Sequence, residues 1–93
     1  MSTFDTIAAK IIEEQELVIG PLARSEAQKV TGLQFSSNHD VILQNGDPKA
    51  VVDRLVAQYE RLFGKASQEV CKEAASSIIA SMPRSDVPAS LLA

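Results

Sequence analysis

The sequence predicts an all-α fold, a four-helix bundle of two helical hairpins with a short extended segment or hairpin around residues 33–45. Three observations support this prediction. Apolar residues recur at steps of three and four through most of the chain, as on one face of a helix. Glycines at positions 20 and 64 interrupt these patterns where one helix can turn into the next. Hydrophobic residues make up 45% of the chain and aromatic residues only 4%, which is typical of helices packed through aliphatic side chains.

The first helix is expected to begin at Ser2 or Thr3, either of which can accept a hydrogen bond from an unpaired amide of the first turn. Its buried face is predicted from apolar spacing. The residues are Phe4, Ile7, Ala8, Ile11, Ile12, Val18 and Ile19. Gln15 interrupts this face at a position that an apolar residue would suit.

Three acidic residues, Glu13, Glu14 and Glu16, follow late in this helix. Negative charge opposes the helix dipole there by roughly 0.3–1 kcal/mol per residue. The three acids are either an ordinary solvated face or a patch that binds a partner with basic residues.

The run Gly20-Pro21 predicts a sharp elbow, because glycine can adopt the left-handed turn that ends a helix and proline suits the first position of the next. A second helix over about 21–30 would then bury four apolar residues. These are Leu22, Ala23, Ala27 and Val30.

The helical pattern stops from Leu33 to Gly46, where Ser36-Ser37-Asn38 and Asn45-Gly46 are turn-forming clusters. Within this stretch, the β-branched and apolar run 41–43 favours a short extended segment. This segment is expected to pair with residues 34–35 as a hairpin or to lie as a loop over the bundle. A free edge would instead be a site for dimerisation by strand addition.

The third helix has the clearest start in the chain, because Asp47 can cap it and Pro48 suits its first position. Its apolar face comprises Val51, Val52, Leu55, Val56, Tyr59, Leu62 and Phe63. After Gly64, a fourth helix is predicted to continue to Met82 and to end at Pro83. Its apolar face comprises Ala66, Val70, Cys71, Ala74, Ala75, Ile78, Ile79 and Met82.

The sequence predicts a single helical domain over residues 1–82 and a flexible tail over 83–93, with docking through the final leucine pair as an alternative. An offset of 44 places Gly20 on Gly64 and brings the apolar faces into register. One interpretation is an internal repeat of 3–32 and 47–76. The alternative is that any two amphipathic helical hairpins align at some offset.

Charge and composition exclude some classes of function. A net charge of −3 and a pI near 5.0 give no general attraction for phosphate backbones, so no nucleic-acid partner is expected. No export signal or run long enough to span a membrane is evident. A single cysteine cannot form an internal disulfide, and a cytoplasmic location is expected.

Residues that carry chemistry are scarce. His39 lies in a polar turn, and Cys71 lies on an apolar helix face where a thiol acts as a small hydrophobe. The two are far apart in sequence and offer no ligand spacing for a metal. The sequence therefore predicts no catalytic residues, no metal and no cofactor, and the protein is not expected to be an enzyme.

The run Ile19-Gly20-Pro21-Leu22-Ala23 resembles the Ile-Gly-Pro-(apolar)-Ala signature of a small, functionally uncharacterised helical module. That module is found at the ends of bacterial, notably cyanobacterial, signalling proteins. The resemblance implies an appended regulatory or interaction domain without enzymatic activity, and no functional residues carry over from it.

The function expected from these observations is that of a regulatory or adaptor module that acts through protein–protein contact and self-association, with an unknown protein partner. The expected contact residues are Glu13, Glu14, Glu16, Tyr59, Phe63, Ile78 and Met82, with Gly20, Pro21 and Gly64 as structural elbows. Two alternatives remain open. One is a phospho-relay or sensor component that uses His39, and the other is a small nucleic-acid binder that uses the first hairpin as a helix-turn-helix.

Overall fold

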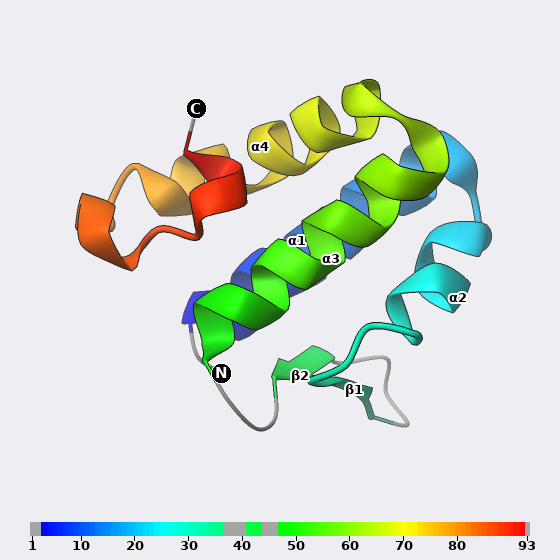
Figure 1. Cartoon of the computed structure of the whole chain (residues 1–93), viewed down its shortest axis with the longest axis horizontal. Helices are drawn as coiled ribbons and strands as arrows, with labels where there is room; N and C mark the ends of the chain where they lie inside the picture. The colour runs from blue at the N-terminus through cyan, green and yellow to red at the C-terminus, as the bar shows by residue number, and fades with distance from the viewer. Residues whose placement is uncertain (1–2, 37–40, 44–46, 93) are drawn as a thin grey trace.

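The computed structural model describes residues 3–36, 41–43 and 47–92, and in this part the chain is mostly helical with one small sheet (Figure 1). The helices are α1 (Thr3–Ile19), α2 (Leu22–Ala27), α3 (Pro48–Phe63) and α4 (Lys65–Ile79). The strands are β1 (Leu33–Phe35) and β2 (Val41–Leu43), and two short 3-10 turns follow, η1 (Arg84–Asp86) and η2 (Ala89–Leu91). The prediction of a mostly helical fold is confirmed.

Local signals in the sequence set the starts and ends of the long helices. The side chain of Asp47 accepts a hydrogen bond from the amide of Lys49 at 3.0 Å, and Pro48 occupies the first turn of α3. Gly20 has a φ of 73° and Gly64 a φ of 88°, values that L side chains rarely adopt. The chain can therefore turn sharply at both positions.

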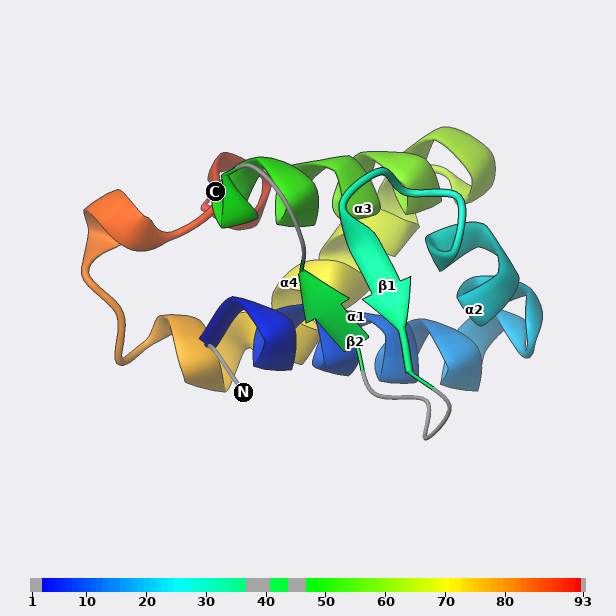
Figure 2. The same ribbon diagram turned by 90° about the horizontal axis from the view of Figure 1, so that it is seen from below.

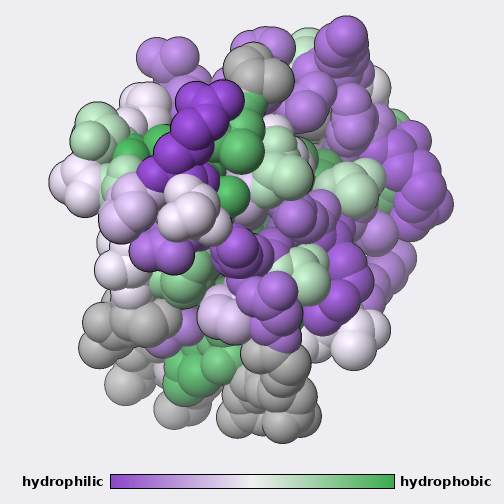
Figure 3. All heavy atoms as spheres, turned by 60° about the vertical axis from the view of Figure 1, so that its left-hand side comes forward, coloured by the Kyte–Doolittle hydropathy of each residue, from purple (hydrophilic) through white to green (hydrophobic). Residues whose placement is uncertain are grey.

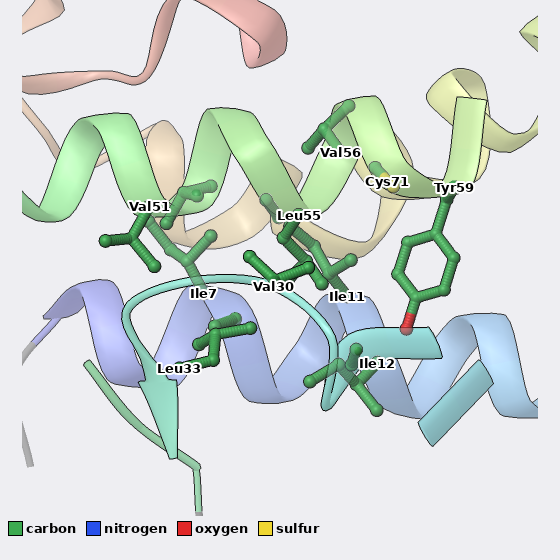
Figure 4. Close-up of a cluster of buried hydrophobic side chains, with 14 of the residues drawn as sticks. Ile7, Ile11, Ile12, Val30, Leu33, Val51, Leu55, Val56, Tyr59 and Cys71 are labelled. Carbon is green, nitrogen blue, oxygen red and sulfur yellow. The ribbon is translucent and has the colours of Figure 1, made fainter. Parts of the chain in front are cut away.

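Helices α1 and α3 lie side by side and point the same way, so that both elbows lie at one end of the molecule (Figures 1 and 2). Helix α4 runs back from this end and packs against both α1 and α3. The core lies between the three long helices (Figure 4). Its largest buried side chains include Ile7, Ile11, Ile12, Val51, Leu55, Val56 and Tyr59.

The two halves of the chain differ in the helix that follows each elbow. Helix α2 has only 6 residues, whereas α4 has 15. Three residues predicted to be buried are exposed near the first elbow and the ends of these helices: Val18 (63%) near the end of α1, Leu22 (46%) at the start of α2 and Leu62 (42%) near the end of α3. The prediction that these side chains belong to the core is wrong. Descent of the two halves from a duplication stays a hypothesis.

Strands β1 and β2 pair antiparallel, with Leu33 opposite Leu43 and Phe35 opposite Val41. Of the two expectations for this stretch, a hairpin or a loop, the structure has the hairpin pairing. The amide of Leu43 donates to a carboxylate oxygen of Asp5 at 2.9 Å, which holds the hairpin against α1.

The C-terminal segment differs from the predicted flexible tail, because it folds back onto α3 and α4 (Figure 1). The side chains of Val87, Pro88 and Leu91 are buried. The carboxylate of Asp53 accepts hydrogen bonds from the amide and the hydroxyl of Ser90. Pro83 precedes η1 and Pro88 precedes η2, and the buried residues of the segment lie from Val87 onward. A sequence too short to fold alone thus packs against a helical surface. Residues 83–92 therefore belong to the packed domain.

Candidate interaction surfaces

Tyr59, expected at the exposed edge of α3, is fully buried, so this prediction is wrong. Its hydroxyl donates to the carbonyl oxygen of Ala23 at 2.7 Å and points toward α2 in Figure 4. Burial raises the pKa of the Tyr59 hydroxyl well above its ordinary value. This residue joins α3 to α2 and is not available to a partner.

The other predicted apolar contacts, Phe63, Ile78 and Met82, are partly buried and pack against the core. Phe63 ends α3, whereas Ile78 lies near the far end of α4, roughly 20 Å along that helix at 1.5 Å per residue. Figure 3 shows the side of the molecule that carries the C-terminal segment, where hydrophobic residues are interspersed with hydrophilic ones. These three residues therefore do not form one continuous surface.

The three acidic residues of α1 have different surroundings. Glu16 accepts a hydrogen bond from Arg24 at 3.2 Å, and the guanidinium of Arg24 also lies 5.3 Å from the ring centre of Phe35. Glu13 is exposed, with Lys10 at 3.9 Å, and Glu14 is half-buried. Glu16 thus helps to hold α2 and β1 on α1, while Glu13 and Glu14 face outward.

Two large apolar side chains follow these acids on the same helix. Leu17 is 78% exposed and Val18 is 63% exposed. Leu17 lies four residues after Glu13, and Val18 four residues after Glu14, so each pair shares a helix face. We call this group of four residues, Glu13, Glu14, Leu17 and Val18, the α1 ridge.

A second surface lies where the segment after α2 meets α3. It is an open cleft of about 360 Å³, which we call the basic cleft. It is lined by Lys29, Val30, Thr31, Arg54, Ala57, Gln58 and Arg61. Arg54 donates from Nε and Nη2 to the carbonyl oxygen of Thr31 at 3.2 and 3.1 Å, and this fork fixes one side of the cleft.

A chain of hydrogen bonds fixes the rest of this cleft. Arg61 donates to Gln58 at 2.9 Å, Gln58 donates to Glu26 at 2.9 Å, and Lys29 donates to Glu26 at 3.1 Å. The bonds from Lys29 and Gln58 lower the pKa of Glu26 and keep its carboxylate ionised. Three cations and one carboxylate leave the cleft positively charged in a protein whose net charge is −3.

A small polar cluster lies inside the core between α1 and α4. The fully buried Gln15 donates from Nε2 to the carbonyl oxygen of Ser67 at 3.0 Å and to Sγ of Cys71 at 3.4 Å. Burial raises the pKa of the Cys71 thiol to about 11. The thiol is therefore neutral at pH 7, which does not favour nucleophilic chemistry.

The phospho-relay residue His39 lies outside the described residues. Among residues that the structure does describe, no group of three or more His, Cys, Asp or Glu side chains comes together as a metal site would require. No described helix has the length and apolar character needed to cross a membrane. Helix α2, which a helix-turn-helix would use for recognition, has one arginine, and that residue is bound to Glu16.

Comparison with known proteins does not assign the chain to a class: no family model, curated protein or solved structure gives a significant match. The α1 ridge and the basic cleft are therefore the two features of the described surface from which a function can be argued.

Sequence reasoning missed the basic cleft and the exposure of Leu17. Part of the cleft could have been predicted from the sequence, because Arg54, Gln58 and Arg61 are spaced by four and three residues and so share a face of α3. Lys29 comes to this face only through the fold. The exposure of Leu17 could also have been predicted, because Leu17 lies outside the apolar face of its own helix.

Proposed function

We propose that this chain is a non-enzymatic regulatory or adaptor module that acts through protein–protein contact and self-association. The observation that carries this proposal is the exposure of Leu17 and Val18, the two most exposed large hydrophobic side chains in the described part of the chain. They are neighbours in a helix whose opposite face already supplies the core. Adjacent exposed apolar residues rimmed by polar ones are typical of a surface that contacts another protein.

The scaffold supports the same proposal. We regard the four helices as a bundle in which the shortened member, α2, leaves the last turn of α1 open. The resemblance of residues 19–23 to an end-of-chain module of bacterial signalling proteins is in keeping with such a role, and a cytoplasmic location belongs to this proposal.

A pull-down from the native cell tests the proposal. We expect the immobilised protein to retain one or more proteins, including added untagged copies of itself, and to lose them in the Leu17→Ser/Val18→Ser variant. Ile42→Ser is the matched control, since Ile42 is a 41% exposed apolar residue on the hairpin. Equal capture by the wild type and the double variant, with unchanged melting temperatures, would contradict the proposal.

A further inference from the structure

The α1 ridge presents an apolar projection beside negative charge. Leu17 stands out of the surface with an exposed fraction of 78%, and Glu13 and Glu14 precede it by one helical turn. Glu13 is only loosely engaged, since Lys10 lies 3.9 Å away and both side chains are more than half exposed. These carboxylates remain available to cations of another molecule.

The basic cleft presents the opposite arrangement. Exposed Ala57 supplies apolar surface, with the largely buried Val30 beneath it, and Lys29, Arg54 and Arg61 supply positive charge around it. Arg54 and Arg61 are held by the hydrogen bonds to Thr31 and Gln58, yet each retains further guanidinium donors, because an arginine side chain has five N–H groups. Such held guanidinium groups bind carboxylates at low entropic cost.

We infer that the partner of the α1 ridge is a second copy of this chain, with Leu17 of one copy entering the basic cleft of the next. The inference rests on the proposed function and names its partner. Apolar surface meets apolar surface, and two carboxylates meet the cations of the cleft. Leu17 is too exposed to fill the cleft of its own chain, so the contact is made between molecules.

The contact joins two different surfaces, so it is heterologous. A heterologous contact closes into a ring only if its rotation permits and otherwise extends as a chain of subunits. The average size of the particles should therefore rise steadily with protein concentration. Because exposed charges contribute, the association should weaken as salt screens them.

Charge reversal on each surface provides the test. The first variant, Arg54→Glu/Arg61→Glu, makes the cleft acidic and leaves the ridge acidic. The second, Glu13→Lys/Glu14→Lys, makes the ridge basic and leaves the cleft basic. Each variant alone should be monomeric in sedimentation velocity, whereas an equimolar mixture should associate, because the acidic cleft of one then matches the basic ridge of the other.

Two further variants keep this test interpretable. Leu17→Ala should weaken association by about tenfold without changing the melting temperature, because it removes only an exposed side chain. Glu69→Lys/Glu73→Lys places the same charge change on exposed positions of α4 and should associate like the wild type.

The inference is overturned if the wild-type protein stays monomeric up to about 1 mM at low salt, if the mixture of reversed variants does not associate, or if either reversed variant associates like the wild type. A wild-type protein that is monomeric, yet whose pull-down of other proteins still depends on Leu17 and Val18, overturns self-contact and the self-association part of the proposed function. Contact between the α1 ridge and a different protein then remains as the proposed function. If the wild-type protein is monomeric and its pull-down does not depend on Leu17 and Val18, both the self-contact and the proposed function are overturned.

Discussion

Residue Cys71 lies at the centre of the packing between α1 and α4, with its thiol fully buried and next to the amide of Gln15. The second donor bond of that amide reaches the carbonyl oxygen of Ser67, so one side chain of α1 engages two residues of α4. Oε1 of Gln15 has no hydrogen-bond donor among the described residues. The interior therefore carries a polar group that stabilises the fold less than a fully bonded one would.

Burial of Cys71 makes the stability of the protein depend on pH. The folded state holds the thiol proton with a pKa of about 11, above the ordinary value of 9.0. The stabilisation is complete below the unfolded pKa and is lost as the pH rises through the folded one. We expect the free energy of unfolding to fall by about 2 kcal/mol between pH 8 and pH 11 from this group alone.

Urea unfolding of the wild type and of Cys71→Ala at several alkaline pH values measures this effect. Cys71→Ala retains Tyr59, whose hydroxyl also titrates at high pH. The difference between the two proteins therefore isolates the contribution of the thiol. Parallel pH profiles for the two proteins would show that the thiol is not shielded in the folded state.

At the scale of elements, the C-terminal segment acts as a strap across α3 and α4. It is held by buried Leu91 and by the bonds between Ser90 and Asp53, which are 37 residues apart in sequence. The ammonium of Lys49 also donates to the carbonyl oxygen of Ser85 at 2.9 Å. The strap thus closes one side of the core.

The neighbouring leucines of this strap allow a matched comparison. Leu91 is 6% exposed and Leu92 is half-buried. We expect Leu91→Ala to lower the free energy of unfolding by about 2–4 kcal/mol and Leu92→Ala by clearly less, because only the first leaves a cavity in a packed site. Chemical denaturation gives both values, and equal small losses would indicate that the strap contributes nothing to stability.

Elements with local signals could be predicted from the sequence, and elements that depend on distant partners could not. Helix α3 begins at Pro48, directly after its cap Asp47, as these two residues predict. The docking of Leu91 depends on the shape of α3 and α4, and the burial of Tyr59 depends on where α2 lies. The apolar spacing places Tyr59 on the inner face of its helix, but neither position carries a local signal of which neighbour it meets.

The α1 ridge and the basic cleft could also be predicted only in part from the sequence. Glu13 and Glu14, the acids of the α1 ridge, were visible as part of a charge run in the sequence, although the third acid of that run, Glu16, proves to be bound within the fold. The basic cleft joins Lys29 to Arg54 across 25 positions of sequence, and only the packing of α2 against α3 brings them together. A sequence pattern can show which face a side chain occupies on its own helix, but not which neighbour it meets.

At the scale of the whole molecule, the long helices supply a closed core and the short α2 leaves an exposed end. Exposed Leu17 and Val18 mark that end, and the positive cleft lies on a different part of the surface. A molecule with two unlike and complementary surfaces is suited to contact with further copies of itself or with a partner that carries one of the two surfaces.

The most direct measurement is a series of two-dimensional amide NMR spectra of the wild-type protein at rising concentration and low salt. The proposed contact predicts that the amide signals of residues 13–18, 29–31 and 54–61 shift progressively as the protein is concentrated to about 1 mM, while those of α4 stay fixed. Spectra that do not change with concentration, or shifts confined to α4 and the C-terminal segment, would contradict it.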